Sequence, residues 1–287
     1  MTRTATITAT TITDTRMDIL SYDFMRTAFA ASGVVALVAG ITGVFLVARS
    51  QTFAGHALSH VGFAGATAAG LIGISPLGGM ILLTVIAGVG MGALGERLSE
   101  RDVAIGMVLA LALGFGLLFL HFYTSFATQA TALLFGNVLA VDTGTLLSLI
   151  GLGVVTLAAL TVISRPLLFA TLQPELAEAQ GVPMRLIGIA FLAIVALAVS
   201  ASVQIVGILL VFTLMVGPAA AAQRLTRTLW GSLALSAGLA IAEAWLGIVI
   251  AFYTDWPTSF CITSLSGLVY FGSLGLASRG PRPAPAV

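Results

Sequence analysis

Charged residues are scarce in this sequence. Asp, Glu, Lys and Arg make up 8% of its 287 residues, whereas 59% are hydrophobic. An ordinary soluble domain carries roughly 25% charged residues, so this chain has too little polar surface to stay dissolved in water. Lipid must be the solvent for most of it. The formal net charge is only +1, and we expect no nucleic-acid partner.

Lysine is absent, and all 12 basic residues are arginine. A phosphate-binding loop of the Walker A type needs a lysine, so any ATP that drives this protein must be hydrolysed by a partner. Cysteine occurs once, at Cys261. A single cysteine excludes an intramolecular disulfide and a CxxC pair, and we expect Cys261 to be a small buried apolar residue.

Long apolar runs, by contrast, are plentiful. A helix needs about 20 mostly apolar residues to cross the hydrocarbon core, and no run shows the alternation of a barrel strand. We therefore predict an all-α polytopic membrane bundle with about eight or nine transmembrane helices. Nine stretches have the required length: 27–48, 53–74, 77–94, 103–120, 145–163, 186–203, 205–222, 229–253 and 260–277. The weakest boundary lies between the sixth and seventh, where only Gln204 interrupts the run.

The ends of the chain differ from this central part. Residues 1–17 are a Thr/Ala/Ile-rich tract, which we predict to be a disordered tail. Residues 18–278 are expected to form one transmembrane domain, followed by a cytoplasmic tail at 279–287.

Arginine placement orients the predicted spans, because basic residues are retained in cytoplasmic loops. If all nine stretches cross, one side of the membrane carries Arg49, Arg97, Arg101, Arg165, Arg185, Arg224, Arg227, Arg279 and Arg282. The loops between spans on the opposite side carry acids such as Asp142 and Asp255. We therefore expect a multi-pass protein of the plasma (inner) membrane with its N-terminus outside and its C-terminus in the cytoplasm. Arg26 lies on the outer side, where Asp23 balances it.

Glycine recurs at the spacing that lets membrane helices pack closely. Gly88 and Gly92 are one helical turn apart, as are Gly62 and Ala66. Small residues at this spacing let two helix backbones approach. The pattern predicts a compact bundle, and it says nothing about a substrate.

The run Gly55-His56-Ala57-Leu58-Ser59-His60 carries the most specific chemistry. On a helix, residues i and i+4 share a face, so the imidazoles of His56 and His60 can share a metal ion. Ionisable groups inside a membrane are costly and usually face a cavity or pathway, which favours a metal path. The alternative is that both histidines are hydrogen-bonded packing residues near the cytoplasmic mouth.

Two other ionisable residues lie in or at the end of a span. Glu243 is deep within the eighth, and could be an additional ligand on the pathway, a proton site or a residue paired to a neighbouring helix. His121 ends the fourth beside Phe122 and Tyr123, where an interfacial aromatic belt explains it better than a ligand role.

The segment 166–184 predicts a short cytoplasmic helix. Pro174 suits a first helical turn, Glu175 suits the N-terminal dipole, and Gly181 followed by Pro183 ends the helix near residue 180. The helix could be a simple connector. Its small face at Ala177 and Ala179, expected to be exposed, would suit docking into a partner.

Five motifs, in order and together spanning most of residues 18–277, resemble the membrane permeases of metal-ion importers of the ATP-binding-cassette class, which handle zinc, manganese and iron. They are Gly55–His60, which resembles a Gly-Asp-Ala-Leu-Ser-His segment, Asp102–Gly106, Leu134–Val141, Pro174–Pro183 and Val206–Ala221. The resemblance implies the permease fold shared by metal and vitamin importers. It implies a transport protein with no permanently bound cofactor and no enzymatic activity of its own, which moves a divalent metal ion, zinc or manganese.

The resemblance also implies partners and residue roles. The partners would be a second permease subunit, giving a homodimer, a cytoplasmic ATPase and an extracellular metal-binding protein. The ATPase would dock on the coupling segment, which includes Pro174, Glu175, Ala177 and Gly181. The family commonly has Asp at the position of His56, and replacing a carboxylate by an imidazole moves the ligand set toward zinc and away from manganese.

Two rival functions remain open at this point. A proton-coupled secondary metal transporter would use Glu243 and the histidines as a proton path. An intramembrane metalloenzyme is disfavoured, because no HExxH motif occurs in the sequence.

Overall fold

The computed structural model describes residues 22–277 except 95–97, 124–132, 137 and 209. The side chains of residues 98–100 and 204 are also outside the description. Both predicted tails, 1–17 and 279–287, therefore lie outside the described residues, as do Arg97, Arg279 and Arg282.

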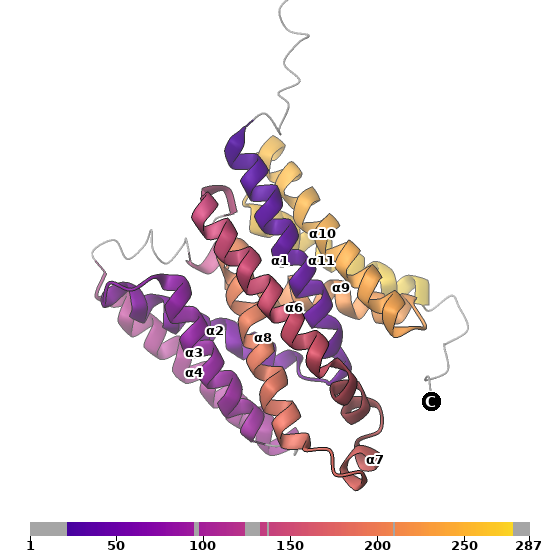
Figure 1. Cartoon of the computed structure of the whole chain (residues 1–287). Coiled ribbons are helices and arrows are strands. Elements are labelled where there is room, and N and C mark those ends of the chain that lie inside the picture. Colours follow the sequence, from indigo (N-terminus) through magenta and orange to yellow (C-terminus); the bar gives the residue numbers. More distant parts are fainter. Residues whose placement is uncertain (1–21, 95–97, 124–132, 137, 209, 278–287) are drawn as a thin grey trace, which may run out of the picture.

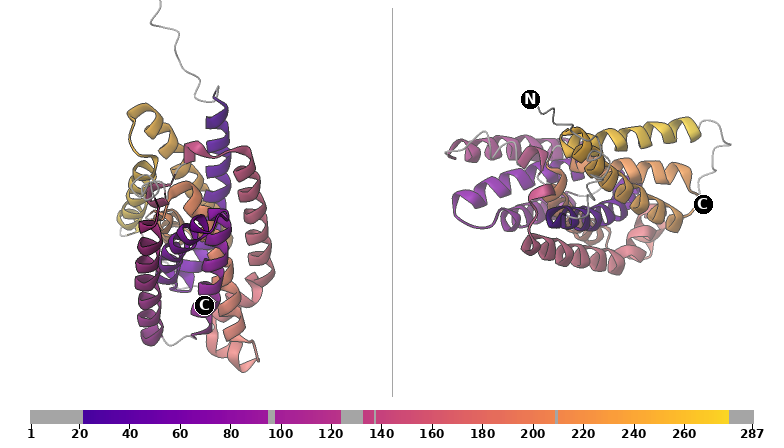
Figure 2. Two further views of the ribbon diagram at one scale, coloured as in Figure 1. Left: turned by 90° about the vertical axis from the view of Figure 1, so that its left-hand side faces the viewer. Right: turned by 90° about the horizontal axis from the view of Figure 1, so that it is seen from above.

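The described chain is helical throughout, as predicted. Its helices are α1 (Asp23–Ala48), α2 (Thr52–Leu71), α3 (Pro76–Ala93), α4 (Leu98–His121), the 3₁₀ turn η2 (Val138–Ala140), α6 (Thr143–Leu172), α7 (Pro174–Ala179), α8 (Met184–Val206), α9 (Val211–Leu225), α10 (Leu229–Thr254) and α11 (Thr258–Ala277). The long helices form one bundle, and α7 lies at the end of it opposite the start of α1 (Figures 1 and 2).

Seven of the described helices are long and apolar enough to cross a membrane: α1, α3, α4, α6, α8, α10 and α11. The two other predicted spans correspond to α2 and α9. Helix α9 has 15 residues, a length of about 22 Å against a hydrocarbon core of about 30 Å. Helix α2 has 20 residues but is rich in Gly and Ala and contains two histidines. Both pack inside the bundle, α2 against α3, α4 and α8 and α9 against α1, α10 and α11, so neither needs a fully apolar surface.

Small residues set the closest helix contacts, as the glycine spacing predicts. A Cβ added at Gly88 would lie 2.6 Å from the carbonyl oxygen of Leu192, and one at Gly92 would lie 2.6 Å from the Cα of Ile189. Helices α3 and α8 therefore meet backbone to backbone. Cys261 is buried and unbridged.

Helix α6 extends further than predicted. The sequence places its end at residue 163, before Pro166, but the helix continues through this proline to Leu172. A proline inside a helix removes one backbone hydrogen bond. The last turns persist because Leu167 and Ala170 are buried, with 0% and 4% of their surface exposed.

The break between α8 and α9 lies later than predicted. Helix α8 runs past Gln204 to Val206, and the chain turns at Gly207, whose φ is +81°. The backbone N–H of Ile208 donates to the carbonyl oxygen of Leu133 at 3.2 Å. The backbones of Gly207 and Gly136, which also has positive φ, are in contact. Contacts with the segment before η2 thus fix the position of the break between α8 and α9.

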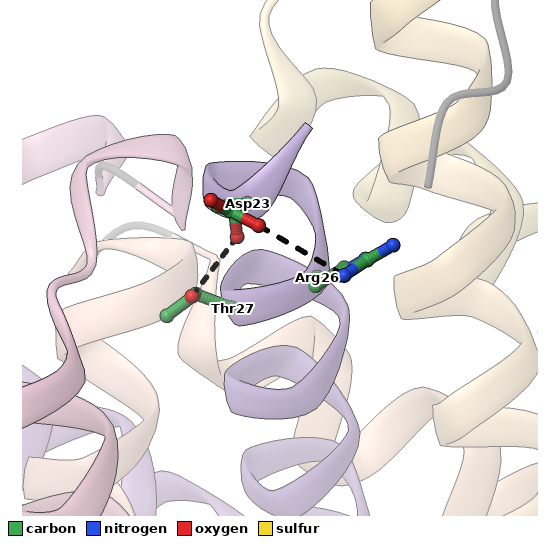
Figure 3. A network of polar contacts seen from close by, with 3 residues as sticks. All are labelled: Asp23, Arg26 and Thr27. Carbon is green, nitrogen blue, oxygen red and sulfur yellow. Dashed lines mark hydrogen bonds and ion pairs between the residues drawn. The ribbon is translucent and has the colours of Figure 1, made fainter. Parts of the chain in front are cut away.

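Polar residues lie at the starts of α1 and α6. At the start of α1, Arg26 pairs with Asp23 at 3.9 Å, and Thr27 donates to the Asp23 carbonyl oxygen at 3.1 Å (Figure 3). Asp142 caps α6 by accepting from the backbone N–H of Thr145 at 3.1 Å. Hydrogen bonds that Thr145 donates lower the pKa of the Asp142 carboxyl, so this end of α6 keeps its negative charge.

Candidate functional site

His56 and His60 lie one turn apart in the first half of α2, on the same face of the helix. Their ring centroids are 4.9 Å apart and the ring planes make an angle of 88°. Zn–N bonds are about 2.0–2.1 Å, so two imidazoles bound to one ion at a tetrahedral angle have ring centres roughly 5 Å apart. The spacing of the two rings fits this requirement.

The Nδ1 atoms of both imidazoles are buried and unpaired among the described residues. His60 is buried and His56 is half-buried, and the Nδ1 atoms of both have no hydrogen-bond partner among the described residues. If these histidines were hydrogen-bonded packing residues, each ring would have such a hydrogen-bond partner. The free Nδ1 atoms therefore favour a ligand role over that reading.

His56 opens onto a depression of about 190 Å³. The depression is lined by Thr52, Phe53, His56 and Phe212. The Phe212 ring lies edge-on to the His56 ring, with centroids 5.5 Å apart. Phe212 comes from the first turn of α9, so the histidine face of α2 is reached beside the α8–α9 break. Sequence reasoning missed Phe53 and Phe212, because an aromatic residue in an apolar run carries no local signal of a pathway.

The described residues offer two possible ligands at the candidate site and no complete cage. Among the described residues, no group of three or more His, Cys, Asp or Glu side chains is placed to hold one metal ion. Two imidazoles leave at least half of the coordination positions of a divalent ion to water or to another subunit. Such a pair alone would bind an ion weakly.

Glu243 is not part of this pair. It lies in α10 with 3% of its surface exposed. Neither carboxylate oxygen forms a hydrogen bond of ordinary geometry with a described residue, and the hydroxyl of Ser266 in α11 lies beside the carboxylate. The structure therefore does not bring Glu243 together with the histidines in one metal-binding group.

His121 is exposed at the end of α4, where its ring contacts Phe122. The neighbouring Tyr123 turns back to α2 and donates its hydroxyl to the carbonyl oxygen of Thr67 at 2.7 Å. His121 and Tyr123 therefore belong to a group of aromatic residues at the end of α4.

Helix α7 forms close to where the sequence predicts it. Pro174 occupies its first turn, and Gly181 ends it with φ of +78°. The backbone N–H of Gly181 donates to Glu178, and that of Val182 donates to Ala177. These two bonds are the Schellman arrangement, which needs a left-handed residue at the position of Gly181.

The expected docking face of α7 is corrected by the structure. Ala177 is fully buried, because α7 packs this side against its own chain. The exposed side instead carries Leu176, and an open depression of about 440 Å³ is lined by Leu172, Gln173, Pro174, Glu175 and Leu176. Ala177 thus holds α7 in place, and Ala179 remains exposed.

Three of the predicted cytoplasmic arginines meet at the same end of the bundle as α7. Arg49, Arg101 and Arg185 line one cavity. Arg49 also donates to the hydroxyl of Thr171, in the last turn of α6, at 3.1 Å. The convergence agrees with the one-sided distribution of arginine in the sequence.

Comparison with known proteins identifies the family. The model of the ABC 3 transport family matches residues 21–277. The chain belongs to the ABC 3 transport family. It is therefore a multi-pass membrane permease of the ATP-binding-cassette type, and the resemblance drawn from its motifs is confirmed.

Two relatives and one solved structure illustrate this membership. The chain is 30% identical over 253 residues to the manganese transport system membrane protein MntC of Halalkalibacterium halodurans, covering 88% of this chain and 87% of the relative. It is 27% identical to the manganese import system permease protein ScaB of Streptococcus parasanguinis, covering 90% and 92%. The structure of PsaBC from Streptococcus pneumoniae in complex with Fab matches with a TM-score of 0.81 at 24% identity, covering 90% of this chain and 94% of that chain. This last likeness concerns the fold alone.

Proposed function

We propose that this ABC 3 permease moves a divalent transition metal ion into the cytoplasm, and that His56 and His60 hold the ion in transit. The observation that carries the proposal is the spacing of the two imidazoles, 4.9 Å between centroids, with Nδ1 atoms that no described residue engages. A pair with few ligands releases its ion readily, as transport requires.

Zinc and manganese are the metals that we propose. The names of the two relatives support manganese. The residues at the candidate site support zinc, because two neutral imidazoles suit zinc better than manganese, which prefers carboxylate oxygen. In this proposal the side chain at position 56 therefore determines whether zinc or manganese is preferred.

We propose that a separate ATPase subunit supplies the energy and docks at α7. The chain contains no lysine, so it cannot form the Walker A contact with ATP phosphates. The exposed depression along Leu172, Pro174 and Leu176 supports docking at this end of the bundle. Gly181 and Ala177 would act by fixing the direction of the helix.

In this proposal the α7 end faces the cytoplasm. The cavity shared by Arg49, Arg101 and Arg185 supports that side, since positive residues are retained inside. The ionised Asp142 and the Asp23–Arg26 pair lie at the other ends of their helices. The chain would enter from outside at α1 and finish in the cytoplasm after α11, in the plasma (inner) membrane.

A second permease subunit would complete the pathway. The depression beside His56 is open, and two ligands leave an ion incompletely coordinated. A second copy facing this depression would bring its own imidazole pair and form a homodimer. An extracellular metal-binding protein would deliver the ion.

Uptake into vesicles tests the proposal against a proton-coupled secondary transporter. The permease would be co-reconstituted with the ATPase subunit that co-purifies with it, and zinc and manganese uptake would be measured with internal and external ATP and with an imposed proton gradient. We expect uptake that needs ATP on the α7 side and is unaffected by the gradient. Gradient-driven uptake without ATP would establish the rival function.

A further inference from the structure

Glu243 is the one charged residue of α10, and the helices around it bring no opposite charge to it. It is buried, and α10 packs against α1, α9 and α11. Those three helices carry charged side chains only at Asp23, Arg26 and Arg224, each in a first or last turn. Glu243 forms no ion pair with any residue that the structure describes. An uncompensated charge inside a membrane is costly, so a protonated, neutral carboxyl group suits this position better than a carboxylate.

The hydroxyl of Ser266, in α11, lies beside the Glu243 carboxyl group. Ser266 is fully buried and donates its hydrogen to the backbone carbonyl oxygen of Thr213, in α9, at 3.1 Å. A hydroxyl group has a single hydrogen, so the oxygen of Ser266 can only accept from Glu243. A protonated Glu243 can donate to it, whereas an ionised one has no hydrogen to give.

Close packing keeps Ser266 in this position. A Cβ added at Gly217, one turn beyond Thr213 in α9, would overlap the Ser266 hydroxyl. A Cβ added at Gly247, one turn beyond Glu243 in α10, would overlap Ile262 of α11. The two glycines thus let α9 and α10 approach α11 close to Ser266, and they leave its side chain little room to turn to another acceptor.

The first turn of α9 has few hydrogen bonds of its own. Its N-cap residue, Leu210, provides no side-chain hydrogen bond. The carbonyl of Leu214 lacks its usual partner within the helix, because residue 218 is a proline and has no N–H. The hydrogen bond from Ser266 to Thr213 therefore contributes to holding this turn in place.

The same turn carries Phe212, whose ring centroid lies 5.5 Å from that of His56. We propose that Glu243, in its protonated form, is a positioning residue for the metal path. Through Ser266 it fixes the first turn of α9, and the Phe212 ring of that turn fixes the orientation of His56. The inference rests on the proposed role of the histidine pair, and it gives the buried acid a role in which it contacts no ion.

Hydrogen exchange of the purified full-length chain in detergent tests the first step without metal or ATP. Glu243→Leu removes the donor but keeps a side chain of similar size, and Ser266→Ala removes the link to α9. We expect each to speed amide exchange in the first turn of α9 about fivefold. Glu243→Gln still donates and should exchange as wild type. Ser273→Ala, which removes a buried hydroxyl that bonds within α11, is the matched control for Ser266→Ala.

Zinc binding to the same variants, measured by equilibrium dialysis, tests the second step. We expect Glu243→Leu and Ser266→Ala each to weaken zinc binding about fivefold, and Glu243→Gln to bind as wild type. Both substitutions break one chain of contacts, so the double variant should bind no more weakly than either single variant. Two independent losses of stability would instead add together, and glutamine would not rescue them.

The possible failures are distinguishable from one another. Unchanged exchange in α9 on Glu243→Leu would overturn the proposal, as would faster exchange with unchanged zinc binding, since α9 would then not act on His56. Equal losses in Glu243→Gln and Glu243→Leu would rule out the hydrogen bond from a protonated carboxyl. Zinc binding that survives the loss of both His56 and His60 would contradict the proposed function of that pair, while the exchange result would still decide whether Glu243 holds α9.

Discussion

The imidazole rings of His56 and His60 lie 4.9 Å apart and almost perpendicular on one face of α2. Side chains four residues apart on a helix are neighbours, but many such pairs point into separate contacts. Here the two rings are in edge-to-face contact, and the Nδ1 atoms are free of partners among the described residues. The candidate metal path follows from this arrangement.

The preference for manganese or zinc should change when residue 56 is replaced. His56→Asp restores the residue type that the family commonly carries there and replaces an imidazole by a hard carboxylate. We expect the ratio of manganese to zinc uptake to rise by roughly tenfold, equivalent to about 1.4 kcal/mol. Competition between the two metals in reconstituted vesicles measures this ratio. His56→Asn, which is neutral and similar in size to Asp, is the control and should not raise manganese uptake.

Ionisation of Glu243 should be dispensable for ATP-driven uptake. It is buried in α10 and lies outside any metal-binding group of described residues. Glu243→Gln keeps the size of the side chain and removes its titration. We expect this variant to retain most of the wild-type uptake and the same dependence on external pH. Loss of uptake with loss of the pH dependence would instead identify Glu243 as a proton site.

The orientation of α7 should depend on the left-handed backbone conformation of Gly181. Its φ of +78° suits glycine, and no atom lies within 4 Å of an added Cβ. Gly181→Ala therefore costs only the left-handed conformation, about 1–2 kcal/mol. We expect weaker ATPase docking, measured by co-purification, with little change in the unfolding temperature of the bundle. Ala179→Gly, at an exposed position of the same short helix, tests whether general loosening of α7 has the same effect.

The α8–α9 break should depend on Gly207. Its φ is +81° and ψ is 167°, a conformation almost restricted to glycine, and a Cβ there would overlap the backbone of Gly136. Gly207→Ala should lower the free energy of unfolding by about 1–3 kcal/mol or more. Thermal unfolding in detergent measures the change. Gly238→Ala, which places a Cβ in open space inside α10, should not lower the unfolding temperature, because alanine favours the helix.

The sequence predicts the features that local chemistry controls. The helix at Pro174 begins and ends nearly where expected, because a proline at its start and a left-handed glycine after its end act over a few residues. The close packing at Gly88 and Gly92 is also predicted, since it depends only on small residues one turn apart.

Features set by distant segments could not be predicted. The end of α8 is fixed at Gly207 by Leu133 and Gly136, some 70 residues earlier in the numbering. The burial of Ala177 depends on the way α7 folds back on the chain. The contact of Phe212 with His56 likewise joins α9 to α2, and no periodicity within either helix indicates it.

The most direct test of the account is ATP-dependent zinc and manganese uptake by the reconstituted permease and ATPase, comparing wild type with the double variant His56→Ala, His60→Ala. We expect the double variant to assemble with the ATPase and hydrolyse ATP, but to lose at least about tenfold in uptake of the transported metal. Thr67→Ala, on the same helix, removes a buried hydroxyl that bonds to Phe63 within α2 and should transport as wild type. Unimpaired uptake by the double-histidine variant would contradict the assignment of His56 and His60 to the metal path.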